Sequence, residues 1–143
     1  MTRTAVPAVD ALTHDLWSAL SPLIRRVFAS YSMPYTQMSA LSRLDRCGPA
    51  TSSELAAQQH VRPQSMAATV GELESAGLVH RTADPDDGRK VLLTITKQGR
   101  ETLARERASS QQWLRDALSE RLSPAEQAEL ARVVSLLERL TAE

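Results

Sequence analysis

The stretch "VRPQSMAATVGELESAGLV" (residues 61–79), with "ADPDDGRKVLLTIT" (residues 83–96) close behind it, decides the fold of this chain. Pro63 suits the first position of a helix, because the N–H group that it lacks would have no helical partner there. Gly77 can end the same helix in a left-handed conformation, and Leu78 is the apolar residue that follows such a stop. The first stretch therefore predicts one helix with a defined start and a defined end.

Two short strands, over residues 78–83 and 89–96, are predicted after this helix. The segment that joins them contains Asp, Pro and Gly, which favour tight turns. Three apolar residues at helical spacing mark the buried face of the preceding helix: Met66, Val70 and Leu73. The region therefore predicts a helix followed by a β-hairpin.

Two shorter helices are predicted upstream. A Gly-Pro pair breaks the chain before Thr51, which with Glu54 has the spacing of a capping box that opens a short helix. Thr36 is predicted to cap an earlier short helix that reaches Arg46. Two short helices, a Gly-terminated helix and a hairpin, in this order, indicate a winged helix-turn-helix.

Amphipathic helices flank this unit on both sides. Before it, apolar residues recur every three or four positions at Val9, Leu12, Leu16, Leu20, Leu23 and Val27. Pro22 lies inside that run and predicts a kink or a break near Leu20. Beyond Lys97, a long helix has apolar positions at Leu103, Trp113, Leu114, Ala117 and Leu118. A last helix, started by Ser123, Pro124 and Glu126, has an apolar face of Leu130, Val133, Val134, Leu137 and Leu140.

The chain is therefore predicted to be mainly α with a small β-hairpin wing. We divide it into an N-terminal dimerisation helix (1–35), a winged helix-turn-helix domain (36–97) and C-terminal dimerisation helices (98–143). The terminal helices have too few partners within one chain to bury their apolar faces, so we expect a homodimer.

Composition excludes some classes of protein. Seventeen basic residues balance 17 acidic ones among 143, which argues against coating nucleic acid by bulk charge but allows a local basic surface. The single Cys47 cannot form an internal disulfide, and we expect a buried, inert thiol. No apolar run is long enough for a membrane span and no signal peptide is evident, so we expect a cytoplasmic protein.

Three segments resemble the MarR family of bacterial transcription regulators: "GPATSSELA" (48–56), "LESAGLVHR" (73–81) and "DPDDGRKVLLTITKQG" (84–99). The resemblance implies a homodimer that places a recognition helix in the major groove, and a wing in the flanking minor groove, of a pseudo-palindromic operator. It also implies that the protein is a repressor, released from double-stranded DNA by a small aromatic or phenolic ligand. Such a ligand changes the spacing of the two recognition helices.

In the wing, the resemblance assigns Arg89 as the residue that enters the minor groove and Asp87 as the carboxylate that braces it. A guanidinium gains more than a scattered set of lysines in this narrow, negative groove, and a charge-assisted pair would order its side chain. Asp84 and Asp86 are predicted to cap the turn. The alternative, a solvated acidic hairpin without a partner, is disfavoured by the helix-turn-helix pattern before it.

On the recognition helix, Gln64, Ser65, Ala68 and Thr69 are predicted to face away from the buried side. Glutamine can pair with adenine, serine with several base edges, and the methyl groups of alanine and threonine with the thymine methyl. Many members of the family carry an arginine near position 68, where this chain has Ala68. Guanine recognition is therefore expected to depend on Arg62 and Arg89. The alternative for the polar residues of this helix is that their face is merely solvated.

Further backbone contacts are predicted around these two elements. Thr51, Ser52 and Ser53 lie where the free amides of a helix N-terminus could meet a phosphate, although Thr51 is more securely a cap. Arg81 and Lys90 are either phosphate contacts or salt-bridge partners. Contacts of this kind predict binding that weakens with salt.

Trp17 and Trp113 are candidate ligand-binding residues, with Arg25 or Arg26 pairing an anionic inducer. The alternative is that both tryptophans belong to the core or to an interface.

No other chemistry is indicated. The three histidines, His14, His60 and His80, have no carboxylate or thiol at ligand spacing, so we predict neither a metal nor a cofactor. No catalytic set of residues is recognisable, so we predict a protein that is not an enzyme. The alternative function is a helical protein-interaction module that does not bind an operator.

Overall fold

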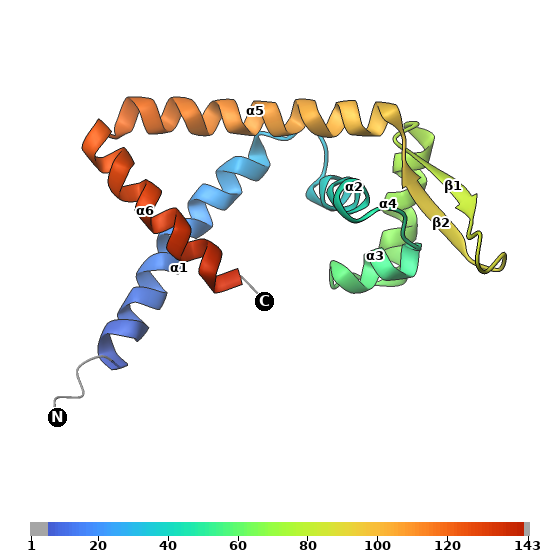
Figure 1. Cartoon of the computed structure of the whole chain (residues 1–143), viewed down its shortest axis with the longest axis horizontal. Helices are drawn as coiled ribbons and strands as arrows, with labels where there is room; N and C mark the ends of the chain where they lie inside the picture. Colours follow the sequence, from blue (N-terminus) through green and yellow to red (C-terminus); the bar gives the residue numbers. More distant parts are fainter. Residues whose placement is uncertain (1–5, 142–143) are drawn as a thin grey trace.

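A computed structural model describes residues 6–141 (Figure 1). The elements along the chain are α1 (Val6–Ala29), α2 (Tyr35–Cys47), α3 (Ser52–Gln58), α4 (Pro63–Ser75), β1 (Val79–Ala83), β2 (Val91–Ile95), α5 (Lys97–Arg121) and α6 (Pro124–Thr141). In Figure 1, α5 lies horizontally along the top of the molecule, with α1 and α6 below its C-terminal half and α2 to α4 with the hairpin at its N-terminal end. The predicted fold class, mainly α with a small β-hairpin wing, is confirmed.

The predicted start and stop signals are present. Thr51 Oγ1 accepts the Glu54 N–H and Glu54 Oε2 accepts the Thr51 N–H, which forms the capping box of α3. At the end of α4, Gly77 has a φ of 73°, and the Leu78 N–H reaches back to the Leu73 carbonyl at 2.9 Å. This is the hydrogen bond of a Schellman stop, for which glycine is the favoured residue.

The wing is a two-stranded antiparallel sheet, and a third short segment extends it. Its register runs from Val79 opposite Ile95 to Ala83 opposite Val91. Ala50, just before α3, forms an isolated bridge with Leu93. The wing is therefore attached to the helix-turn-helix by backbone hydrogen bonds as well as by the α4–β1 connection.

The hydrophobic core lies within the winged helix-turn-helix part of the chain. Its largest fully buried side chains are Leu41, Leu55, Met66, Val70, Leu73, Leu93 and Leu103. The predicted buried face of α4 is confirmed, since Met66, Val70 and Leu73 are each at most 1% exposed. Leu103 brings α5 into the same core, so this end of the long helix is fixed to the winged unit.

Two expectations from the sequence are wrong, namely that Thr36 caps α2 and that Cys47 is buried. Thr36 does not cap α2, because Pro34 is the N-cap residue and its carbonyl accepts the N–H groups of Gln37 and Met38. Of the kink or break predicted near Leu20, the break is absent, since α1 continues through Pro22. Cys47 is exposed, because α2 ends at this residue and no core element covers the thiol.

The apolar faces of α1 and α6 pack poorly within one chain. Trp17 and Leu140 are more than 70% exposed, and other exposed apolar residues on these helices are Val9, Leu12, Leu23, Ile24, Phe28, Leu130, Val133, Val134 and Leu136. Within the described residues, no helix combines the length and the apolar character that a membrane crossing requires.

Candidate nucleic-acid interface and adjoining cavity

The outer face of α4 is polar and open to solvent. Gln64, Ser65 and Ala68 are exposed, on the face opposite the core positions. Thr69 is half-buried, and its hydroxyl donates to the Ser65 carbonyl at 3.1 Å within the helix. Three of the four residues predicted to contact bases are therefore exposed, and the Thr69 hydroxyl is engaged within the helix.

Positive charge reaches this face from outside the helix. The segment Pro63–Ser75 contains no lysine or arginine, and Arg62 is the N-cap residue immediately before it. Arg62 is exposed and its side chain makes no capping hydrogen bond. It lies beside the helix N-terminus, where free N–H groups already favour an anion such as a phosphate.

The wing holds its arginine as the resemblance implied. Arg89 Nε lies 3.3 Å from Asp87 Oδ1, and the same oxygen accepts the Arg89 backbone N–H at 3.1 Å. The Arg89 side chain remains 91% exposed. Asp84 Oδ1 accepts the Asp86 N–H at 2.8 Å, which caps the turn as predicted for Asp84. The Arg89 guanidinium, held beside Asp87, is therefore open to solvent on the wing.

Arg81 and Lys90 differ in their surroundings. Arg81 Nε forms an ion pair with Glu74 Oε2 at 2.9 Å, which joins β1 to the end of α4. Lys90 is exposed at the wing, beside Arg89. Arg81 therefore has the second of its two predicted roles, that of a salt-bridge partner. Lys90 is exposed and available for a phosphate.

The N-terminus of α3 is already occupied by its own cap. The hydrogen bonds from the Thr51 backbone and side chain hold the pKa of Glu54 below its ordinary value of 4.5, and the charges of Lys90 and Arg43 lower it slightly further. Ser53 is exposed and Ser52 half-buried. Thr51 is thus a structural cap, and Ser53 is the more accessible of the neighbouring hydroxyls.

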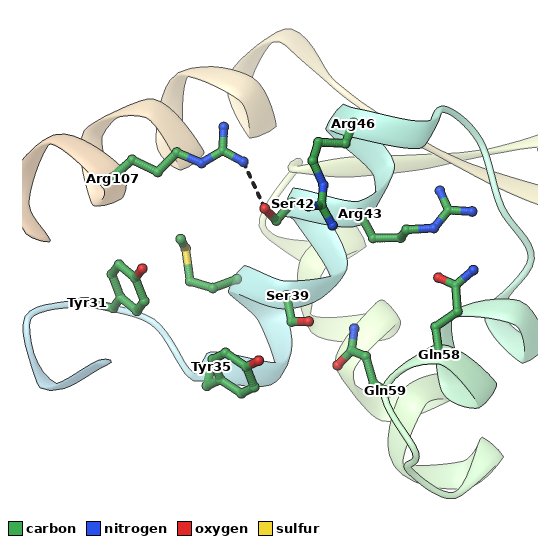
Figure 2. A pocket seen from close by; sticks show the side chains of 10 residues that line it. Tyr31, Tyr35, Ser39, Ser42, Arg43, Arg46, Gln58, Gln59 and Arg107 are labelled. Atoms are coloured by element: carbon green, nitrogen blue, oxygen red, sulfur yellow. Dashed lines mark hydrogen bonds between the residues drawn. The ribbon is translucent and has the colours of Figure 1, made fainter. Parts of the chain in front are cut away.

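A cavity of about 320 Å³ lies between α2, the end of α3 and α5 (Figure 2). Its lining includes three guanidinium groups and no carboxylate: Tyr31, Tyr35, Met38, Ser39, Ser42, Arg43, Arg46, Gln58, Gln59 and Arg107. Arg43 Nη1 and Gln59 Nε2 are buried and have no hydrogen-bond partner among the residues that the structure describes. Buried donors without acceptors cost free energy, and an anionic or carbonyl-bearing ligand would satisfy them.

Arg107 joins α5 to α2 at the wall of this cavity. Its guanidinium donates to Ser42 Oγ at 2.8 Å, as Figure 2 shows, and lies 3.3 Å from Asp45 Oδ2. The residues predicted to bind a ligand, Trp17, Arg25 and Trp113, do not line this cavity. The Arg26 guanidinium lies 5.5 Å from the Trp113 ring centre, which is a cation–π contact within the chain.

The sequence reasoning missed the cavity residues for a physical reason. Ser39, Ser42, Arg43 and Arg46 do follow a helical face of α2, and that polar stripe was the available signal. A polar stripe is usually a solvated surface, however, and only the approach of α3 and α5 turns this one into a cavity wall. Among the described residues, no three His, Cys, Asp or Glu side chains gather as a metal site would require.

Comparisons with known proteins agree with this geometry. The model of the MarR family matches residues 33–91. An HTH-type transcriptional regulator of Mycobacterium bovis is 36% identical over 111 residues, which cover 76% of this chain and 78% of that protein. An HTH-type transcriptional repressor of Mycobacterium tuberculosis is 29% identical over 89 residues, or 62% of this chain and 64% of that protein. The crystal structure of a protein assigned as a transcriptional regulator of Pseudomonas aeruginosa superposes with a TM-score of 0.83 at 31% identity, covering 95% of this chain and 96% of that one.

Proposed function

Because this chain belongs to the MarR family of transcriptional regulators, we propose that it is a homodimeric repressor that binds a pseudo-palindromic operator. The Mycobacterium tuberculosis relative is itself a repressor, which supports repression of transcription over activation. We assign residues 1–35 and 98–143 to dimerisation and residues 36–97 to DNA binding. A two-fold dimer would place its two recognition helices one helical turn of DNA apart.

The observation that carries this proposal is the braced arginine of the wing beside an exposed polar helix. Arg89 is almost fully exposed, yet Asp87 orders it through two hydrogen bonds. An ordered cation loses less conformational entropy when it enters a minor groove. Gln64, Ser65 and Ala68 are exposed on α4 and would face base edges in the major groove.

The substitution Arg89→Ala tests the wing. We expect operator fragments selected with the wild-type protein to bind the variant at least about tenfold more weakly, because each dimer loses two groove contacts. Arg105→Ala is the matched control, since this arginine is exposed on α5 and bonds Thr102 within the same helix. Equal affinities of the two variants, titrated at one salt concentration, would remove the wing from the mechanism.

The neutral net charge and the absence of basic residues within α4 favour, as a second candidate, a module that binds a partner protein. Salt dependence separates the two functions. Operator binding through phosphate contacts must weaken steeply as salt rises, because bound counterions are released. Binding to a protein partner need not show this slope.

The cavity supports release by a small ligand. Its volume of about 320 Å³ is within the range of small-molecule sites, and its unpartnered donors on Arg43 and Gln59 suit a carboxylate on an aromatic ring. Because it lies between α2 and α5, a ligand there could change the angle between the winged domain and the dimerisation helices. Spacing of the recognition helices would then no longer match the operator.

Titration with benzoate and hydroxybenzoates tests this part of the proposal. We expect the bound operator to be released, and Arg43→Met to raise the concentration required by about tenfold or more, because a buried charge-assisted hydrogen bond is lost. Arg25→Met is the control, and it also tests the site first predicted around Trp17 and Trp113. Impairment by Arg25→Met with a normal response of Arg43→Met would place the ligand at that other site.

A further inference from the structure

A buried carboxylate on α5 holds the turn between α1 and α2. Glu106 is only 8% exposed, although most acidic side chains of this chain are on the surface. Its Oε2 accepts the Ser32 backbone N–H at 2.8 Å, and its Oε1 accepts the Ser32 hydroxyl. Both carboxylate oxygens are therefore committed to one residue that lies 74 positions earlier in the chain.

This contact lies at the junction between α1 and α2. Ser32 lies between the end of α1 at Ala29 and the start of α2 at Tyr35. In Figure 1, α1 meets α5 near the middle of the long helix, and the chain then passes on to α2. Any change of angle between α1 and the winged domain must therefore bend the chain at this turn or move the turn along α5.

The next residue of α5 holds α2 itself. Arg107 bonds Ser42 and pairs with Asp45, and Arg100, two helical turns earlier, lies 3.8 Å from the same carboxylate. Aromatic contacts also cross the turn, since the Phe28 and Tyr35 rings have centres 4.3 Å apart. Apolar contacts such as these tolerate sliding, whereas two hydrogen bonds to one serine fix both position and direction.

Stability alone does not explain a buried carboxylate here. Removing a carboxylate from water is unfavourable, and an apolar pair of similar volume is often at least as stabilising as a buried polar one. What a directional polar pair adds is a single arrangement, because a shifted turn would leave the Glu106 charge without its donors.

We propose that Ser32 and Glu106 are positioning residues that set the angle between the dimerisation helices and the winged domain. In the homodimer proposed above, on which this inference rests, that angle determines the separation of the two recognition helices. Loss of the pair leaves the fold and the dimer in place but lets the two winged domains adopt a range of separations.

The chain carries its own site for the measurement. Cys47 is its single cysteine, is exposed, and ends α2 within the winged domain. A nitroxide on Cys47 of each subunit allows the distance between the two winged domains of the full-length dimer to be measured by pulsed dipolar spectroscopy. We expect one narrow distribution for the wild type, and a roughly twofold broader or clearly shifted one for Ser32→Ala and Glu106→Gln.

Two matched controls accompany these variants. Ser30→Ala removes a hydroxyl near the same turn that donates to Val27 within α1, and Glu101→Gln changes an exposed carboxylate on α5. Both controls are expected to retain the wild-type distribution. If Glu106→Gln fails to fold, as judged by circular dichroism, Ser32→Ala decides the matter, because Ser32 is exposed and its loss opens no cavity.

The outcomes are separable. A wild-type distribution in both Glu106→Gln and Ser32→Ala, the second of which keeps the backbone hydrogen bond, overturns the positioning role while leaving the dimer intact, and so does equal broadening in Ser30→Ala. Absence of dipolar coupling in the wild type contradicts the proposed homodimer, and the inference, which rests on it, is then also wrong.

Discussion

At the scale of single residues, the Arg89–Asp87 pair adds little to the stability of the fold. The Arg89 side chain is 91% exposed, and ion pairs at such exposed sites contribute only about 0–1 kcal/mol to stability. Asp87 instead orders the wing locally, because its side chain accepts the Arg89 N–H and its carbonyl accepts the Lys90 N–H. These two bonds fix the backbone of the turn at Arg89 and Lys90, and the weak ion pair keeps the guanidinium beside Asp87.

Gly99 shows how a single residue fixes the wing to α5. A Cβ atom at this position would overlap the Leu78 carbonyl oxygen and lie 2.7 Å from Ile95 Cγ1. Both neighbours belong to the core, where neither can move far, so the first turn of α5 can pass the hairpin this closely only without a side chain.

We expect Gly99→Ala to lower the free energy of unfolding by about 1–3 kcal/mol, the usual effect of an overpacked core. Gly71→Ala is the matched control, because a Cβ there has no heavy atom within 4 Å and the residue lies inside α4. Alanine is the better helix former, so this control should gain about 0.5–1 kcal/mol. Urea denaturation of both variants measures the difference, and a neutral Gly99→Ala would contradict the close approach.

At the scale of elements, the sequence predicts what is determined locally. The capping box at Thr51 and the left-handed stop at Gly77 each depend on a few neighbouring residues, and both are present. The predicted strands 78–83 and 89–96 differ from the observed ones by at most two residues at any end. Thr36 was misjudged because Pro34, two residues earlier, supplies the carbonyl that starts α2.

The sequence could not predict features that depend on distant elements. The cavity wall combines residues of α2, α3 and α5, and Glu106 meets Ser32 across 74 positions. Helical spacing does place Glu106 on the same face of α5 as Leu103, and Glu101 off that face, but it does not show which distant residue the Glu106 carboxylate meets. Cys47 was expected to be buried because cysteine usually is, but the end of a helix overrides that tendency.

The capping boxes of α3 and α6 predict a dependence of stability on pH. Hydrogen bonds from Thr51 lower the pKa of Glu54, and those from Ser123 lower the pKa of Glu126, both from 4.5. A carboxylate with a lowered pKa in the folded state stabilises the fold above its unfolded pKa, and this contribution is lost as pH falls through the folded value.

We therefore expect the melting temperature of the wild type to fall between about pH 5 and about pH 3, and that of Glu54→Gln to fall less, because glutamine keeps the box but does not titrate. Glu129→Gln, an exposed position on α6 outside the capping box, serves as the control for simple loss of charge. A slope in Glu54→Gln as steep as in the wild type would mean that the box contributes nothing to the acid sensitivity. Calorimetry across this pH range makes the comparison.

At the scale of the whole molecule, the two ends of the chain are built differently. The winged end has a closed core of fully buried residues, whereas α1 and α6 expose apolar side chains along most of their length. A contiguous apolar surface of this kind usually marks an interaction site. Because α1 and α6 lie on the side of the molecule away from the wing (Figure 1), a second copy could cover them without blocking the recognition helix.

A charge on that surface tests the assembly directly. Val133 is 41% exposed in the single chain and shares a helical face with Leu130, Leu137 and Leu140. Val133→Glu should therefore be harmless to a monomer, but in a dimer it would bury a carboxylate without a partner, which is strongly unfavourable. We expect its dimer dissociation constant to rise by about tenfold or more, as measured by sedimentation velocity over a range of concentrations.

Ser135→Glu introduces the same charge on the opposite face of α6, where Ser135 is exposed, and should leave the assembly unchanged. Operator affinity should follow dimerisation in both variants, because a single winged domain makes only half of the contacts. A Val133→Glu protein that stays dimeric at every concentration would show that α6 lies outside the interface. The apolar face of α1, with Trp17 at its most exposed point, would then be the remaining surface for association.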